Sequence, residues 1–310
     1  MQKAATAKAK ASRKATPTKA VGGARAAARP KATTGKSPNG KRAGTGRIAI
    51  LGGGNLGQAL ARGWTVSGVA KPAELRIVRR RPERLAELAA LGIKTGSDNR
   101  AAAKASDIIV IAVQPQQIEP LLDEIASVLD PQRHRVISVV SGVSIAVLSA
   151  RLPGVPVVRA MPNTAVTIRE SMTCLAAGPE HRAALAEAQV LFDAVGKTLE
   201  IREEMMVPAT ALCACGVAFF LRSVRAASQG GIEIGFHPDE AMLLAAQTAR
   251  GAASLLLREG SHPEAEIDRV TTPRGCTIAG LNEMEHQGFS SALIKGILLS
   301  AEKAAGLYGG

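Results

Sequence analysis

The chain has 310 residues, of which 46% are hydrophobic, and its 39 Lys or Arg against 26 Asp or Glu give a formal net charge of +13. Residues 1–47 hold 13 of the basic residues and no acidic one, so the remaining 26 basic residues balance the 26 acidic ones. This balance excludes a basic nucleic-acid-binding domain beyond residue 47. The hydrophobic content excludes a wholly disordered chain and a coiled coil.

Residues 1–45 consist mainly of Ala, Lys, Arg, Thr, Gly and Pro, without an aromatic residue. Such a segment buries too little apolar surface to offset its ordering entropy, so we expect a disordered basic tail. A solvated extension is the favoured role. Contact with nucleic acid or another polyanion, and an organellar transit peptide, remain as alternatives.

Cysteine usage and hydropathy indicate the cellular compartment in which the protein is expected. Cys213 and Cys215 are too close for an ordinary disulfide, and no zinc-ligand spacing is present, so we expect buried thiols and no metal site. The N-terminal segment lacks an apolar secretory core. We therefore expect a cytoplasmic protein. The uncharged residues 205–221 are interpreted as a buried core helix rather than a membrane span.

The order of predicted elements indicates an α/β fold, a Rossmann-type doubly wound parallel sheet followed by an all-helical C-terminal domain. Strands are predicted at 48–51, 75–79, 107–113, 135–140 and 156–161, with helices over 58–64, 82–91 and 117–128. Further helices are predicted over 204–229, 238–259, from about 277, and over 289–306. The expected division is a tail (1–45), a dinucleotide-binding domain (46–203) and a helical domain (204–310).

A glycine fingerprint directly follows the first strand. Gly52, Gly54 and Gly57 form G-x-G-x-x-G, with Asn55 and Leu56 between the last two glycines. In this pattern the first glycine permits the tight turn, the second allows a pyrophosphate to approach the backbone, and the third lets helix and strand pack closely. The sequence therefore predicts a dinucleotide at this turn, with its phosphates at the helix N-terminus.

The second strand ends in Arg79, Arg80 and Arg81, where an NAD-binding protein carries an acid for the ribose 2′-hydroxyl. Basic side chains at this point suit the 2′-phosphate of NADP. We expect NADPH, with NADH as the alternative. The competing interpretation is a solvated basic turn.

The later strands end in small, proline or polar residues at the edge where ligands bind in open α/β sheets. Cofactor-binding candidates at these ends are Ala112, Val113, Gln114, Pro115, Met161 and Asn163. Asn163 could bond the nicotinamide carboxamide or orient its loop. Each of these, taken alone, is also ordinary turn chemistry.

The most distinctive C-terminal segment runs from Val270 to Leu281, a polar, glycine-containing loop that leads into a helix start. Such a loop can present N–H groups and hydroxyls to an anion. An ordinary capped helix is the alternative.

Together, the glycine fingerprint, Arg159 to Thr164 and Val270 to Leu281 resemble the pyrroline-5-carboxylate reductase family over residues 47–306. The resemblance implies a Rossmann domain, a helical domain that intertwines with the partner subunit, and a homodimer or higher homo-oligomer. It also implies NAD(P)H-dependent reduction of 1-pyrroline-5-carboxylate to proline. The imine would lie between the cofactor and the partner's helical domain.

By position, the resemblance implies that Thr277 is the catalytic threonine whose hydroxyl meets the pyrroline nitrogen. It places Thr272, Gly275 and Cys276 at the substrate carboxylate, and Asn99 near the adenosine end of the cofactor. No His or acid stands in these motifs, which fits a substrate that is already protonated.

The sequence also departs from the family pattern. Arg274 replaces the first glycine of the usual Gly-Gly pair, Cys276 replaces Thr or Ala, Gln114 replaces Lys, and 213–219 read Cys-Ala-Cys-Gly-Val-Ala-Phe. These departures leave two alternatives to the main interpretation. They are a reductase of another cyclic imino acid and a non-catalytic paralogue that binds dinucleotide or nucleic acid.

Overall fold

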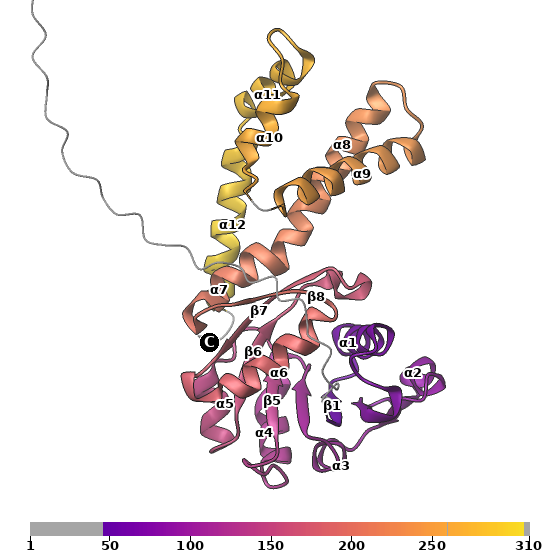
Figure 1. Ribbon diagram of the computed structural model, residues 1–310, viewed down its shortest axis with the longest axis vertical. Helices are drawn as coiled ribbons and strands as arrows, with labels where there is room; N and C mark the ends of the chain where they lie inside the picture. Colours follow the sequence, from indigo (N-terminus) through magenta and orange to yellow (C-terminus); the bar gives the residue numbers. More distant parts are fainter. Residues whose placement is uncertain (1–45, 259, 307–310) are drawn as a thin grey trace, which may run out of the picture. The chain divides into compact units, whose positions relative to one another are not determined.

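The computed structural model describes residues 46–258 and 260–306 (Figure 1). The predicted disordered tail, residues 1–45, lies outside the described residues. All strands of the described chain precede Glu203, and only helices and turns follow it. Residues 44–310 nevertheless cluster as one unit, so a domain boundary at 203/204 stays a prediction.

Eight strands form one sheet in the order β3-β2-β1-β4-β5-β6-β7-β8. Every neighbouring pair is parallel except β6 and β7, which confirms the Rossmann-type fold with one antiparallel exception. The exception follows from chain length, because a parallel return needs a crossover of a dozen or more residues. The strands are β1 (Ile48–Leu51), β2 (Leu75–Val78), β3 (Lys94–Gly96), β4 (Ile108–Ile111), β5 (Arg135–Ser138), β6 (Val157–Met161), β7 (Ser171–Ala177) and β8 (Gly196–Glu200).

Helices cover both faces of the sheet because the buried strands are apolar on both sides. Ile48 and Ile50 belong to one core cluster, whereas Ala49 and Leu51 belong to the other. The first cluster includes Trp64, which meets Phe192 edge to face and donates from Nε1 to the Leu191 carbonyl at 2.8 Å. The covering helices are α1 (Asn55–Ser67), α2 (Ala86–Ala90), α3 (Asn99–Lys104), α4 (Ile118–Ala126), α5 (Ile145–Arg151) and α6 (Arg182–Asp193).

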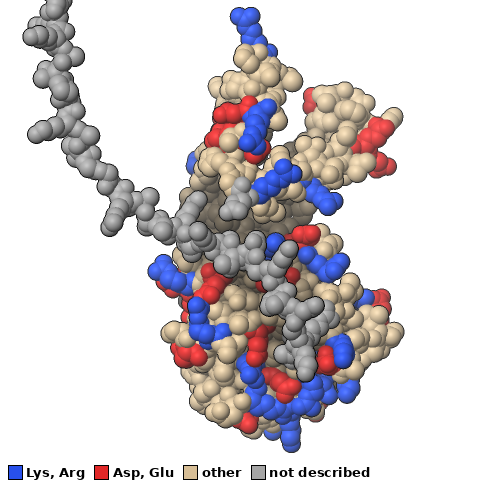
Figure 2. All heavy atoms as spheres, in the orientation of Figure 1, with Lys and Arg blue, Asp and Glu red and all other residues tan. Residues whose placement is uncertain are grey.

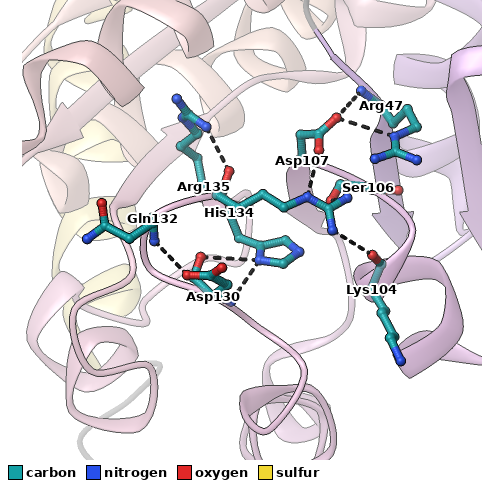
Figure 3. Close-up of polar contacts among 9 residues, drawn as sticks. Arg47, Lys104, Ser106, Asp107, Asp130, Gln132, His134 and Arg135 are labelled. Carbon is teal, nitrogen blue, oxygen red and sulfur yellow. Dashed lines mark hydrogen bonds and ion pairs between the residues drawn. The ribbon is translucent and has the colours of Figure 1, made fainter.

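An ion-pair network joins the chain just before β1 to the loops around β4 and β5 (Figure 3). The Asp107 carboxylate accepts from the Arg47 backbone N–H and from Arg133 Nε, each at 2.9 Å. Burial opposes ionisation of Asp107, but these hydrogen bonds outweigh it and lower the pKa of the carboxyl to about 2. The carboxylate therefore stabilises the folded state wherever it is ionised.

The helical segment begins with one long helix that changes its winding. A 3₁₀ turn (Glu203–Met205) and α7 (Met206–Ala209) lead into a π-helical turn (Thr210–Cys215), which α8 (Gly216–Glu233) continues. The predicted end at 229 was therefore four residues too early. The remaining helices are α9 (Pro238–Leu256), α10 (Pro263–Val270), α11 (Cys276–His286) and α12 (Phe289–Ala305), of which α10 was not predicted.

The long helix is largely exposed in the single chain. Its most apolar window is 22% buried, and Leu212, Phe220 and Leu221 are each more than half exposed. Within one chain this helix is not buried, so burial of residues 205–221 as a core helix stays a prediction. By length and composition the helix also meets the criterion for a membrane span, as core helices of soluble proteins do. Figure 2 shows extensive uncharged surface on the helical segment.

Candidate active site

The glycine turn between β1 and α1 is shaped by close backbone contacts. Gly52 has φ +118°, and an added Cβ would stand 2.3 Å from the Ala112 carbonyl oxygen. A Cβ on Gly57 would stand 2.1 Å from the Gly52 carbonyl oxygen. Neither position admits a side chain, as the fingerprint requires.

Gly54 differs from the other two fingerprint glycines. It is the N-cap of α1 with φ −76°, and a Cβ there would meet no atom within 4 Å. Asn55 and Leu56 follow as the first residues of α1, whose amide groups lack partners within the helix. The open space at Gly54 and these N–H groups form a cradle that suits an anion.

The basic end of β2 contacts this turn directly. Arg79 Nη1 donates to the Gly53 carbonyl oxygen at 3.0 Å, and Gln58 Nε2 donates to the same oxygen at 3.0 Å. Arg80 and Arg81 are exposed. The structure thus places one arginine of the predicted 2′-phosphate site against the glycine turn and leaves the next two at the surface.

The end of β4 lies beside the glycine turn. Ala112 N donates to the Leu51 carbonyl at 2.8 Å, and its own carbonyl faces Gly52. Val113 and Gln114 follow, and Pro115 opens a 3₁₀ turn. These residues therefore share the edge of the sheet that carries the fingerprint.

The Asn163 carboxamide forms hydrogen bonds within the protein through both its oxygen and its nitrogen. Its Oδ1 accepts from Ala165 N at 3.0 Å, and its Nδ2 donates to the Cys213 carbonyl at 3.3 Å. These bonds orient the loop after β6 and join it to the π-helical turn. Met161 is buried, and Ser141 Oγ lies 3.9 Å from its sulfur. Contact of either residue with a cofactor stays a prediction.

A buried arginine beside this loop was missed from the sequence. Arg159 of β6 is 6% exposed, and its Nη1 donates to Glu203 Oε1 at 3.1 Å. The same oxygen accepts from the Ile145 backbone N–H at 2.6 Å. One carboxylate therefore joins β6, the start of α5 and the entry into the helical segment. A charge inside the apolar run 157–161 was the signal that such a partner exists.

Asn99 stands at the start of α3, and its Nδ2 donates to Glu124 Oε2 of α4 at 2.9 Å. The adjoining Gly96, Ser97 and Asp98 line a cavity of about 260 Å³ between β2, β3 and α3. The predicted adenosine contact of Asn99 stays a prediction.

The loop before α11 is a tight turn. Gly275 N donates to the Thr272 carbonyl at 2.9 Å, and Arg274 between them adopts φ +60°. A left-handed conformation favours glycine, so Arg274 stands where glycine would fit without strain. Gly275 is the N-cap of α11, so Cys276 and Thr277 occupy its first two positions.

The two halves of the predicted site are apart within one chain. The glycine turn lies at the start of α1, whereas α10 and α11, which flank the predicted substrate loop, lie at the end of the helical segment remote from the sheet (Figure 1). The structure therefore brings Gly52, Gly54, Gly57, Arg79 and Ala112 together, but not with Thr272 or Thr277.

Comparisons with known proteins bear on both halves. Residues 203–307 match the family model for pyrroline-5-carboxylate reductase dimerisation, and residues 47–142 match the model for coenzyme F420-dependent NADP oxidoreductases. Pyrroline-5-carboxylate reductase 2 of Dictyostelium discoideum is 48% identical over 275 residues, which cover 83% of this chain and 92% of the relative. The chain belongs to the pyrroline-5-carboxylate reductase family. The match to the dimerisation domain supports a homo-oligomer.

Other family members agree with this assignment. Pyrroline-5-carboxylate reductase 1 of Dictyostelium discoideum is 48% identical over 274 residues, and this chain spans 50% of its length. A solved pyrroline-5-carboxylate reductase from Coxiella burnetii has 27% identity and a TM-score of 0.78, covering 84% of this chain and 97% of that one. The Plasmodium falciparum enzyme with NADP bound, 23% identical, has a TM-score of 0.77 over 85% and 98% of the two chains, which shows the shared fold.

The cysteines are all free and differ in burial. Cys174 is buried, Cys213 and Cys215 are half-buried, and Cys276 is exposed. The expectation of four buried thiols was therefore wrong for Cys276, which occupies the first turn of α11. In the described part of the chain, no group of three or more His, Cys, Asp or Glu could hold a metal ion.

Proposed function

We propose that the chain is an NADPH-dependent pyrroline-5-carboxylate reductase that reduces 1-pyrroline-5-carboxylate to L-proline. The observation that carries this proposal is the 48% identity to a Dictyostelium reductase across 92% of that protein. In this reaction one hydride and one proton add across the C=N bond, and one NADPH becomes NADP⁺.

The chain's residues fit the cofactor. The cradle at Gly54 has room where a side chain would stand, while Gly52 and Gly57 admit none. Asn55 and Leu56 would hold the pyrophosphate through their backbone N–H groups, and Arg79 and Arg80 would hold the 2′-phosphate. The bound nicotinamide supplies the hydride. NADH is the alternative cofactor.

The substrate would be held by the loop before α11. Thr272, Gly275 and Cys276 would bind its carboxylate, and the Thr277 hydroxyl would orient the ring nitrogen. These roles rest on the family resemblance. Because the site motifs contain no general acid, the chain's contribution is positioning of an already protonated imine.

The assembly that completes the site would be a homodimer or a larger homo-oligomer. Two features support this: the substrate loop lies apart from the glycine turn, and the long helix exposes Leu212, Phe220 and Leu221. Exposed apolar surface of this kind marks an interaction site. We further propose that the protein is cytoplasmic. Residues 1–45 would serve as a solvated extension.

The test uses the purified full-length protein and follows NADPH oxidation with 1-pyrroline-5-carboxylate. We expect one proline formed per NADPH consumed, and a larger kcat/KM for this substrate than for its six-membered homologue. Sedimentation is run on the same sample, where a fully active monomer would contradict the proposed assembly.

A reductase of another cyclic imino acid is the second candidate. Arg274 in a left-handed conformation and the exposed Cys276 both alter the predicted carboxylate loop. A larger kcat/KM for the six-membered ring would favour this candidate. NADPH binding without turnover of either imine would favour the non-catalytic paralogue.

A further inference from the structure

Two thiols meet where the sheet joins the helical segment. Cys174 lies on β7, where it pairs in register with Met161 of β6, and it is 3% exposed. Cys213 lies on the π-helical turn and is half-buried. Cys174 belongs to a small core cluster with Met161 and Met206, and Cys213 packs against the same cluster.

The two side chains are hydrogen-bonded to each other, and this bond makes them chemically unequal. It lowers the pKa of the Cys213 thiol to about 7, although burial works in the opposite direction. The same bond, with burial, raises the pKa of Cys174. Cys213 is therefore the thiol that ionises, and Cys174 keeps its proton and donates it to the bond.

This asymmetry is the arrangement of a reactive thiol beside a resolving thiol. The lowered pKa gives Cys213 a larger thiolate fraction at neutral pH than a free cysteine, whose pKa is about 8.5. The thiolate is the form that attacks peroxides and disulfides. Cys213 is also the more accessible of the two, so an oxidant meets it first.

The backbone around Cys213 is irregular. The turn Thr210–Cys215 is π-helical, a winding that is rare and often found at functional sites. The Asn163 amide donates to the Cys213 carbonyl at 3.3 Å, which fixes the turn against the loop after β6. A simpler interpretation is that two small thiols only fill space, and this predicts no special reactivity.

We propose that Cys213 and Cys174 form a peroxide-reactive dithiol that closes to an intramolecular disulfide. The Cys213 thiolate attacks one oxygen of hydrogen peroxide, the O–O bond breaks, and a sulfenic acid and hydroxide form. Hydroxide takes up the proton that Cys213 released and becomes water. The Cys174 sulfur then attacks the sulfenic sulfur, the S–O bond breaks, and a second water leaves with the Cys174 proton. Two thiols are oxidised, and one peroxide is reduced to two waters.

The disulfide would tie β7 to the first helix of the helical segment. It would close a loop that contains the rest of β7, α6 and β8. Cys174 pairs in register with Met161, which lies two residues before Asn163. The dithiol is independent of the proposed reductase activity, because neither thiol is assigned a role in it.

The test is disulfide mapping of the full-length protein. Hydrogen peroxide is added, free thiols are blocked with N-ethylmaleimide, and the protein is digested with trypsin without reductant. We expect a link between the peptides 170–182 and 203–222, two hydrogens lighter than their sum and lost on reduction. Cys276, which is exposed and lies on peptide 275–295, is the reference thiol in the same digest.

Matched variants identify which cysteine sulfurs form the disulfide. Peptide 203–222 carries both Cys213 and Cys215, so Cys215→Ser should keep the link and Cys213→Ser should abolish it. In Cys174→Ser the sulfenic acid should persist at Cys213 and be captured by dimedone. The proposal is overturned if peroxide oxidises Cys276 before any 170–182 to 203–222 link forms, or if the link survives in Cys213→Ser. The wild-type and Cys215→Ser results decide the question even if Cys174→Ser does not fold.

Discussion

Gly54→Ala separates cofactor binding from folding at the glycine turn. Gly54 has φ −76° and ψ −169°, an extended conformation that alanine adopts without strain, and the added methyl meets no atom within 4 Å. Alanine is a somewhat poorer N-cap than glycine, at a cost of roughly 0.5 kcal/mol, and the reduced freedom of the unfolded chain offsets a similar amount. We therefore expect a free energy of unfolding close to that of the wild type.

The effect on binding should be large. The methyl would occupy the space through which a pyrophosphate reaches the N–H groups of Asn55 and Leu56. Loss of one charge-assisted hydrogen bond costs about 1.5–3 kcal/mol. This corresponds to a roughly tenfold to hundredfold rise in the Kd for NADPH.

Gly57→Ala is the matched control, because it makes the same chemical change three residues away. Its methyl would stand 2.1 Å from the Gly52 carbonyl and 3.1 Å from Ile50 Cγ2, so α1 must move away from β1. Overpacking of this kind costs about 1–3 kcal/mol, or several degrees of Tm.

The assay is NADPH titration by fluorescence, with thermal unfolding of the same samples. We expect Gly54→Ala to lose affinity at an unchanged Tm, and Gly57→Ala to lose both. Wild-type affinity in Gly54→Ala would refute the assignment of the cradle to the pyrophosphate. If the Tm of Gly54→Ala fell as much as that of Gly57→Ala, the claim that Gly54 affects cofactor binding without affecting folding would be refuted.

Four further outcomes are expected. Replacing Arg79 and Arg80 with Ala should raise the KM for NADPH far more than that for NADH, and equal changes would argue for a solvated basic turn. Thr277→Ala should lower kcat/KM about tenfold to hundredfold, the value of one hydrogen bond to a charged nitrogen, and leave the Kd for NADPH unchanged. Arg274→Gly relieves a left-handed residue (φ +60°) but frees the unfolded chain, so both Tm and kcat/KM should change little. Asp107→Asn should cost about 1 kcal/mol at pH 7 after solvent screening. Because the pKa of Asp107 is lowered to about 2, this difference should shrink in urea titrations as the pH falls below 4 and be lost as the pH falls through 2.

The sequence predicted those parts of the fold whose signal is local. The run Ile48–Leu51, the fingerprint and the following helix are contiguous, and the structure has β1, the turn and α1 there. Three strands were not predicted, and two of them, β3 and β8, lie at the edges of the sheet. β3 is the three-residue Lys94–Gly96, and β8 has one large apolar residue, Leu199, among Gly, Lys, Thr and Glu. β7 mixes Ser, Met, Thr and Cys and gains its burial from α6 and the helical segment.

The parts of the site that depend on distant residues could not be predicted. Arg159 and Glu203 are 44 residues apart, and only folding shows that one carboxylate serves both Arg159 and Ile145 N. The contact of Cys174 with Cys213 likewise needs β7 and the π-helical turn to be adjacent. Arg79 was predicted at the cofactor from its place after β2, and its hydrogen bond to Gly53 became visible only in the structure.

The exposed helix and the separated site halves have one explanation. The helical segment carries the predicted substrate loop between α10 and α11 and also exposes the apolar face of α8 at Phe220 and Leu221. Any second copy that covers this face fixes the position of its own substrate loop relative to the first copy, because both features lie on one helical segment. In the proposed assembly, burial of the apolar face and completion of the predicted site would therefore be the same event. In the proposed assembly, the cost of exposing α8 in one chain would then bring Thr277, the predicted substrate residue of one copy, towards the glycine turn of another.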